Sequence, residues 1–579
     1  MFAPHNTIAP RALRLLLVTA GTVVAAVLAR YVWTQGTRAP AAPPPATSSS
    51  AARETGVETP RPATTQPPAP RDYHLDRDLT ASAEAFKAYA EGVDLSRRLP
   101  VQAAARFRRA VMLDPGFAPA HYRLAMAGLL LSRRDEAAAE IKAAMDNQER
   151  LPEPYRSVAP VLQHFAAGAF DLVVAALPDA LARQPFDPDL HYLAGVTCAS
   201  SCDHFDPNGA VEHFEQVLSA DPGHAPARAA LMAAYAMKGM NDWWLSRAME
   251  YQSVNPQLSE AVAEVGKVRT ARGEYGDAIE VADEILRRGE DVYALGLAPA
   301  FILAGHNKQV ADMWDPEMER RNSPAANMLT HLHAGINDVW LGRFDKAVQH
   351  FERGAEFLPG PWERSGRALF LLLLGRTHAL TGRAREADAA FEAAQQVAGQ
   401  RPVLEYCLGV NKLRSAPAAE AERVARRLGQ EVRVSQPGWN EPWRRLLLGE
   451  IALAAKEPTR AIDEFRQAWQ LEKPLATDCI VQYTDAYFLD ALGRAYLAAG
   501  KAQDALAAFD QIRALGVKGL NQPEIVVLAL YRSGRALQLL NRGGEARARY
   551  RQFLNLWGEG EGAPQEVADA RARISAILP

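Results

Sequence analysis

A step of 34 residues recurs along this chain and restricts the folds that are open to it. Ala103 and Ala137 are 34 positions apart, and Pro222 and Pro256 are separated by the same step. A repeat of this length is one supersecondary unit, and such a unit cannot bury its apolar face alone. The chain is therefore predicted to be a stack of units in which each unit contacts its neighbours.

Residue types at fixed places within the unit indicate a pair of packed helices. The unit that starts at Ala486 has Gly493 at position 8, Ala505 at position 20 and Phe509 at position 24. Small residues at positions 8 and 20 let two helices approach closely, and large residues at positions 4, 11 and 24 fill the space between them. A proline at position 32, such as Pro222, ends the second helix because it lacks an N–H donor and its ring clashes with the preceding turn.

This pattern resembles the tetratricopeptide repeat (TPR) superfamily over roughly residues 80–560. The units that match best are centred on Gly335/Ala347/Phe351, Gly375/Ala387/Phe391, Gly449/Ala461/Phe465, Gly493/Ala505/Phe509 and Gly534/Ala546/Tyr550. The resemblance implies an all-α, TPR-like superhelical solenoid of antiparallel helix pairs, with about 12–13 hairpins. It also implies that the solenoid binds other molecules, which is what such stacks commonly do.

Several segments depart from the pattern. The unit between Pro222 and Pro256 has Trp244 at position 20, so its two helices are expected to splay or to shift in register. Residues 290–327 and 401–440 have the length of a unit but lack most of its pattern, and residues 151–190 match only in part. We interpret these segments as degenerate helical hairpins within the same stack.

The repeat step also lengthens late in the chain. It is 44 residues from Ala461 to Ala505 and 41 residues from Ala505 to Ala546. The extra residues are expected in longer helices or turns.

Two stretches support a finer resemblance. Residues 78–89 and 550–557 look like the beginning and the end of the TPR region in bacterial transmembrane Ser/Thr kinases and winged-helix membrane regulators. In those families a cytoplasmic output domain precedes the membrane helix. Here about a dozen residues precede the apolar run near the N terminus. The resemblance therefore does not carry an output domain over to this chain.

That apolar run predicts a membrane anchor. Residues 15–29 carry no charge, which is short for a bilayer-spanning helix of about 20 residues. A helix over residues 12–33 reaches that length if Arg14 and Arg30 extend their side chains outward. Trp33 would then lie in the aromatic belt at the membrane surface.

The alternative is a signal peptide that is cleaved after the small-residue site at 27–29. We favour the anchor because an aromatic flank and a tether-like linker follow it. The predicted domains are an N-terminal anchor at 1–34, a Pro/Ser-rich linker at 35–72 and the solenoid at 73–579. The protein is predicted to span the inner membrane once, with its bulk in the periplasm, or to be soluble in the periplasm if cleaved.

Composition and motifs exclude several functional classes. The chain has 65 basic and 68 acidic residues and a net charge of −3, so it lacks the basic footprint of a nucleic-acid-binding protein. No phosphate-binding loop, His-Glu-x-x-His, Gly-x-Ser-x-Gly or kinase motif occurs in it. We therefore predict that it is not an enzyme and that it needs no cofactor.

Cys198 and Cys202 are candidates for a disulfide. Their C-x3-C spacing is weak support for zinc, although His191, His204 and His213 are close in sequence. A disulfide that closes a small insert suits an oxidising compartment, and two free thiols are the alternative. We predict no metal site. Two other cysteines stand alone and are expected to be buried as small hydrophobic residues, Cys407 and Cys479.

Aromatic and charged residues on the first helix of several units form the predicted partner-binding site. In a TPR stack, positions 2, 5, 9 and 12 of that helix line the concave surface. The residues of interest are Arg376, Trp443, Glu450, Tyr487, Arg494, Tyr531 and Arg535. Aromatic residues and arginine dominate binding hot spots. In the alternative interpretation, Arg494 pairs with Glu450 or Asp490 and the tyrosines pack between units.

These features predict a membrane-tethered TPR scaffold or adaptor that binds a protein or peptide partner outside the cytoplasm. The alternative is the sensory subunit of a signalling system whose output domain lies on another chain. A third hypothesis, an unrecognised enzyme, rests only on the region from Cys198 to His213.

Overall fold

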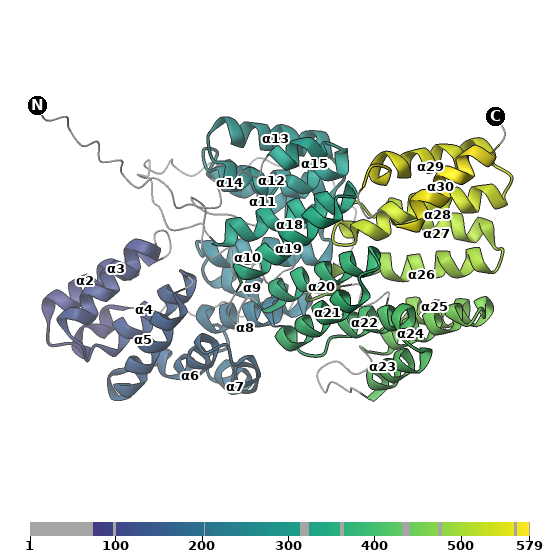
Figure 1. Ribbon diagram of the computed structural model, residues 1–579. Helices are drawn as coiled ribbons and strands as arrows, with labels where there is room; N and C mark the ends of the chain where they lie inside the picture. The colour runs from purple at the N-terminus through teal and green to yellow at the C-terminus, as the bar shows by residue number, and fades with distance from the viewer. Residues whose placement is uncertain are drawn as a thin grey trace, which may run out of the picture.

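A computed structural model of the chain describes residues 73–96, 100–131, 133–201, 203–312, 324–358, 364–430, 440–472, 477–560 and 564–577. Over these residues the protein is an all-α solenoid of antiparallel helix pairs (Figure 1), which confirms the predicted fold class. The predicted anchor at 12–33 and the linker at 35–72 lie outside the described residues. Within the described part, no helix combines the length and the apolar character needed to cross a bilayer.

The first half of the solenoid contains six regular helix pairs. After the 3-10 turn η1 (Tyr73–Leu79), these are α2 (Ala83–Ser96) with α3 (Pro100–Leu113), α4 (Ala118–Leu130) with α5 (Arg134–Asp146), α6 (Tyr155–Ala166) with α7 (Phe170–Arg183), α8 (Pro188–Ser200) with α9 (Pro207–Ala220), α10 (Ala225–Lys238) with α11 (Asn241–Val254), and α12 (Ser259–Ala271) with α13 (Tyr275–Arg287). A short 3-10 turn, η2 (Gln148–Arg150), follows α5.

Three short helices interrupt the regular stack. They are α14 (Asp291–Leu295), α15 (Ala298–Ala304) and α16 (Asn307–Asp312), and they occupy part of the segment at 290–327 that lacks the repeat pattern. The segment at 401–440, which also lacks most of the pattern, forms a regular pair instead. The characteristic residues at the repeat positions are therefore sufficient to specify a helix pair, but they are not required for one.

Six more pairs and a final helix make up the second half. They are α18 (Pro324–Trp340) with α19 (Phe344–Glu356), α20 (Arg364–Leu380) with α21 (Ala384–Ala398), α22 (Pro402–Ser415) with α23 (Ala418–Gln430), α24 (Asn440–Ala454) with α25 (Pro458–Glu472), α26 (Asp485–Ala498) with α27 (Ala502–Arg513), α28 (Pro523–Leu539) with α29 (Gly543–Trp557), and then α30 (Gln565–Ala576).

A glycine packed against an aromatic ring sets the distance between the helices of a pair. A Cβ atom on Gly493 in α26 would lie 2.4 Å from Cε1 of Phe509 in α27. The same arrangement joins Gly92 to Phe107, Gly195 to Phe214, Gly335 to Phe351, Gly375 to Phe391, Gly449 to Phe465 and Gly534 to Tyr550. The alanines at position 20 are fully buried at the same contact, as in Ala103, Ala347 and Ala505. Positions 8, 20 and 24 of the repeat therefore specify one close-packed contact.

The extra residues of the two lengthened steps form turns that reach across the molecule. The first insert contains the antiparallel strands β1 (Thr477–Asp478) and β2 (Gln482–Tyr483), between α25 and α26. The hydroxyl of Tyr483 donates a hydrogen bond to the carbonyl of Ala236, 2.7 Å away in α10. The second insert contains the 3-10 turn η4 (Gly516–Gly519), which contacts α12 and α15. Both inserts thus join the late units to the early ones.

The pairs from α18 to α29 curve back until the last pair meets the first. The indole N–H of Trp557 in α29 donates to the carbonyl of Val339 in α18 at 3.0 Å. The ring of Trp557 also lies 5.2 Å from that of Phe344 in α19, in an edge-on arrangement. In Figure 1, α28 accordingly lies beside α18, and the two helices are in contact. The inner surface of these six pairs is therefore enclosed.

The cysteines differ from the sequence prediction. Cys198 is a free thiol, which contradicts the disulfide predicted between Cys198 and Cys202. Cys202 lies outside the described residues. Burial raises the pKa of the Cys198 thiol to about 12, so it stays protonated at neutral pH.

Cys407 is a buried free thiol, as predicted, whereas Cys479 in the β1–β2 turn is buried and disulfide-bonded.

The helix contact predicts the effect of one added methyl group. Gly493→Ala should lower the free energy of unfolding by about 1–3 kcal/mol, since overpacking forces the ring of Phe509 to move. Gly544→Ala in α29 is the matched control, because a Cβ there meets nothing within 4 Å. It should leave stability unchanged or raise it by up to about 1 kcal/mol through helix propensity. Thermal and urea unfolding followed by circular dichroism measures both, and equal effects would contradict the contact.

The cysteine pattern is tested by alkylating exported protein that has been denatured without reduction. Peptide mass spectrometry should find Cys198 and Cys407 alkylated and Cys479 unlabelled. Reduction before alkylation should expose Cys479. A Cys479 peptide alkylated without reduction would contradict the disulfide.

Candidate partner-binding site

The predicted site residues come from the inner helices of four units. Arg376 lies on α20, Trp443 and Glu450 on α24, Tyr487 and Arg494 on α26, and Tyr531 and Arg535 on α28. Where one helix carries two of them, they are four or seven residues apart, which brings them near one face of that helix. We call these helix faces together the inner surface.

That surface is packed rather than open. Arg376, Trp443, Glu450, Tyr487 and Tyr531 are all buried, and none is more than 7% exposed. The interpretation of these five as the lining of an open groove was wrong. The reason is the tight curvature of the six pairs, which brings the inner faces of helices from separate units into mutual contact.

Aromatic rings fill the middle of this surface. The ring of Trp443 lies 5.5 Å from that of Tyr487 and 5.3 Å from that of Phe488, both in T-shaped arrangements. Tyr406 of α22 completes the group, with ring centroids 5.6 Å from Trp443 and 5.9 Å from Tyr487. Such pairs contribute about 0.5–1.5 kcal/mol beyond area burial. Tyr406 was not among the predicted site residues because its unit, at residues 401–440, lacks most of the repeat pattern, although Tyr406 stands at position 5 of that unit.

Arg376 connects units that are far apart in sequence across the inner surface. Its guanidinium donates from Nε to Glu524 and from Nη1 to the carbonyl of Asn521, both at 2.8 Å. It also lies over the ring of Tyr487, 5.1 Å from the centroid. Burial alone would lower the pKa of Arg376, but the Glu524 carboxylate raises it above its usual value. Arg376 thus joins α20 to the start of α28, 148 residues later.

Arg494 is the centre of a second charged group. It pairs with both carboxylate oxygens of Glu450, one at 2.9 Å, and donates from Nε to Asp490 at 2.8 Å. Glu450 also accepts a 3.0 Å hydrogen bond from the hydroxyl of Tyr406, and Asp490 accepts from Arg532. Burial would lower the pKa of Arg494, yet the two carboxylates raise it well above the ordinary value. The alternative interpretation, in which Arg494 is a member of structural ion pairs, is confirmed.

Arg535 differs from the other six residues. It is exposed, although it lies one turn after the buried Tyr531 on α28. Its contact with a partner stays a prediction.

The histidines near Cys198 form a pair rather than a metal centre. Nδ1 of His191 lies 2.9 Å from Nδ1 of His213, and Nε2 of His191 lies 3.0 Å from the carbonyl of Pro185. Because a carbonyl only accepts, Nε2 of His191 carries a proton. Burial and, secondarily, His191 lower the pKa of His213 to about 4. Among the residues that the structure describes, no three His, Cys, Asp or Glu side chains are arranged to hold a metal ion.

The helix pairs and their glycine–aromatic contacts define a class: over the described residues this is a TPR-like helical repeat protein. No family model and no curated protein matches the chain. Among solved structures it is similar to the Cut9–Hcn1 hetero-tetramer of APC/C, at 14% identity and a TM-score of 0.28, over 88% of this chain and 99% of that chain. It is also similar to the human IFIT1 dimer with m7Gppp-AAAA, at 14% identity and a TM-score of 0.37, over 76% of this chain and 90% of that chain.

At such scores these likenesses carry no argument about ligands. The finer resemblance to transmembrane kinases and winged-helix regulators is not confirmed by them.

Two charge reversals distinguish a structural arginine from an exposed one. Arg494→Glu should lower the free energy of unfolding by about 3–5 kcal/mol, because it leaves Glu450 buried without its cation and removes one of the two arginines that pair with Asp490. Arg535→Glu, which changes an exposed side chain of α28, should change it by no more than about 0.5 kcal/mol. Chemical unfolding of each single variant measures the difference. Equal stability of the two variants would show that the ion pairs do not hold this surface together.

Proposed function

We propose that this protein is a membrane-tethered scaffold or adaptor that binds a protein or peptide partner outside the cytoplasm. The observation that carries the proposal is a set of exposed apolar side chains on the outer helices of the early units. A helical repeat solenoid presents a long, rigid surface for such contacts.

Three of these side chains lie on the single helix α11. Trp243 is 58% exposed, Met249 56% and Val254 73%. Other exposed apolar residues, on the second helices of earlier units, are Met112, Leu172 and Val174. Single exposed apolar residues are ordinary, but α11 carries three of them on its outer side. Trp and Met are also among the residue types enriched in protein interfaces. We call Trp243, Met249 and Val254 the α11 patch and propose it as the partner contact.

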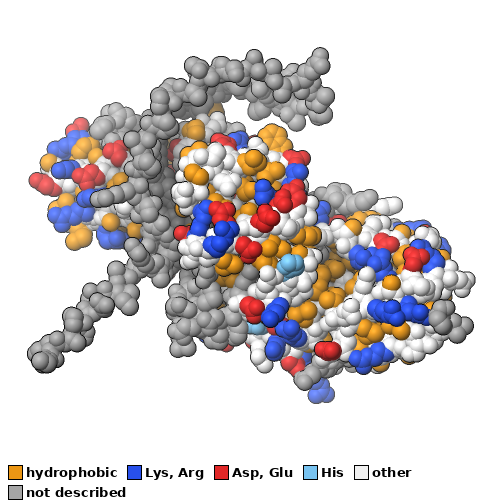
Figure 2. Space-filling model, turned by 90° about the horizontal axis from the view of Figure 1, so that it is seen from above, with side chains coloured by type: hydrophobic (Ala, Val, Ile, Leu, Met, Phe, Trp, Pro, Cys, Tyr) orange, Lys and Arg blue, Asp and Glu red, His pale blue; other side chains and the backbone are white. Residues whose placement is uncertain are grey.

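The charge distribution favours a protein partner over a nucleic acid. On the face seen in Figure 2, basic and acidic side chains are interspersed among hydrophobic ones, with no field of a single sign. A net charge of −3 agrees with this distribution. A nucleic-acid surface would need basic residues clustered on one face.

The proposed location rests on the N-terminal sequence and on one cysteine. The apolar run at 12–33 and the Pro/Ser-rich linker at 35–72 suit a tethered domain. The disulfide at Cys479 supports an oxidising compartment, because disulfides persist in the periplasm and are rare in the cytosol.

The patch is tested with the full chain in its native membrane. Replacing both Trp243 and Met249 by alanine should reduce crosslinked partner about tenfold or more, because truncated hot-spot residues cost about 2 kcal/mol or more. Leu539→Ala is the matched control, since Leu539 on α28 is equally exposed at 56%. Unchanged melting temperatures would show that both variants are folded.

The outcome separates the candidate functions. Equal recovery from the double variant and wild type would overturn the patch. A captured kinase or transcription regulator would favour a sensory subunit, whereas a structural envelope protein would favour the scaffold.

A further inference from the structure

The disulfide at Cys479 has a partner that the cysteine count identifies. The chain contains four cysteines, namely Cys198, Cys202, Cys407 and Cys479. Cys198 and Cys407 are free thiols, whereas Cys479 is disulfide-bonded. Cys202 lies outside the described residues, and it is the one cysteine that remains as a partner within a single chain.

Cys479 lies in a turn that is buried where late and early units meet. The turn residues 479–481 are no more than 1% exposed, although connections usually run over the surface. Two backbone N–H groups of the turn donate to Asp478, at 2.7 and 3.1 Å, and fix its shape. The hydroxyl of Tyr483, just after the turn, donates to the carbonyl of Ala236 in α10. Cys479 is therefore held close to the early units.

The connection between α8 and α9 reaches towards the late units from the other side. Asp203, the residue after Cys202, accepts a 3.0 Å hydrogen bond from Nη2 of Arg401, which directly precedes α22. Arg401 is itself buried. The same connection is fixed to α8, because the N–H of Asp206 donates to the carbonyl of Cys198 at 2.9 Å. The neighbours of both cysteines thus bridge the early and the late units.

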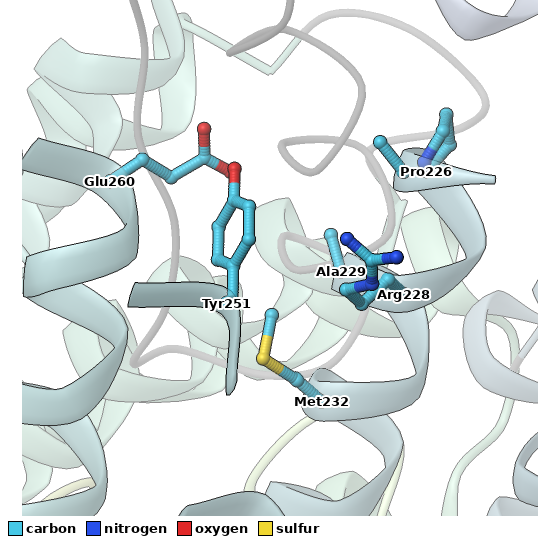
Figure 3. A pocket seen from close by; sticks show the side chains of 7 residues that line it. Pro226, Arg228, Ala229, Met232, Tyr251 and Glu260 are labelled. Carbon is cyan, nitrogen blue, oxygen red and sulfur yellow. The ribbon is translucent and has the colours of Figure 1, made fainter. Parts of the chain in front are cut away.

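The early helix that receives the insert is packed loosely on its own partner. Trp244 occupies position 20 of α11, where most other units have a small residue, and its buried indole donates to Glu264 of α12 at 3.3 Å. Correspondingly, α10 and α11 pack less closely than the other regular pairs of the first half. The predicted splay is therefore present, and it leaves an opening beside Tyr251 with room for about one water molecule (Figure 3). Contacts from the late units support α10 where α11 does not.

We propose that Cys202 and Cys479 form a disulfide that joins the α8–α9 connection of the early units to the β1–β2 insert of the late units. The two cysteines are 277 positions apart, and the cross-link of so long a loop restricts the unfolded chain strongly. The ion pair of Asp203 lies next to Cys202, and the hydrogen bond of Tyr483 lies four residues after Cys479. The two halves of the solenoid are then held by a covalent bond as well as by polar contacts. This inference does not depend on the proposed partner-binding role.

The bond forms by oxidation and is protected from exchange. The two thiols lose two protons and two electrons as the sulfurs join, and an external disulfide takes them up and becomes two thiols. Exchange with a free cysteine would need its thiolate, which is the attacking form. Burial raises the pKa of both Cys198 and Cys407 to about 12, so both stay protonated at neutral pH. The bond should therefore persist although Cys198 lies only four residues from Cys202.

Peptide mapping of exported protein, alkylated in denaturant without reduction, tests the pairing. Trypsin leaves Cys198 and Cys202 on one peptide, 184–228, and Cys479 on another, 467–494. We expect these two peptides to be joined, with Cys198 alkylated, and to separate after reduction. Fragmentation between the first two cysteines assigns the bonded sulfur. A bond through Cys198, or a Cys479–Cys479 bond between two chains, would overturn the proposal.

Variants test what the bond holds together. Cys202→Ser should abolish the joined peptide and leave Cys479 open to alkylation, whereas the matched control Cys198→Ser should retain the bond. Hydrogen exchange at residues 479–483 and in α10 should become about tenfold faster or more in Cys202→Ser and stay unchanged in the control. If Cys202→Ser does not accumulate, the same exchange is measured on folded wild-type protein before and after reduction. Unchanged exchange after loss of the bond would show that it does not hold the two halves together.

Discussion

The contact between a glycine on the first helix of a unit and an aromatic ring on the second is what the rest of the structure depends on. With a Cβ at Gly493 the helices could not approach Phe509 as they do. The same contact recurs along the chain, so each unit has nearly the same shape as its neighbours. Equal units stacked with a small rotation form a superhelix, and the curvature of that superhelix decides which surfaces remain open.

In this protein the curvature of the later units removes the inner surface from solvent. Arg376 reaches Glu524, and Trp557 reaches the carbonyl of Val339, so units that are far apart in sequence hold one another. Inner positions that would contact a ligand in an open stack instead contribute aromatic packing and buried ion pairs. The outer helices of the early units remain exposed, and we propose that the partner binds there.

One irregularity in the stack shows how a departure from the repeat produces a distinct feature. Trp244 stands where the packing rule requires a small residue, and the pair that carries it is the one that opens beside α12. A solenoid of perfectly regular units would lack this wider spacing between α10 and α11.

Much of the fold was predictable from sequence, since the spacing of Gly493, Ala505 and Phe509 encodes a contact between residues close in the chain. The splay at Trp244 followed from the same local rules, whereas the ion pairs of Arg494 were only the alternative to its predicted role in partner binding. The burial of Tyr487, the bond at Cys479 and the hydrogen bond from Tyr483 to Ala236, 247 residues away, did not. Those features depend on the rotation accumulated over many units, and no single repeat specifies that rotation. Sequence alone therefore determined the unit and its stacking, and only the tertiary structure decided where the stack closes and which side chains it encloses.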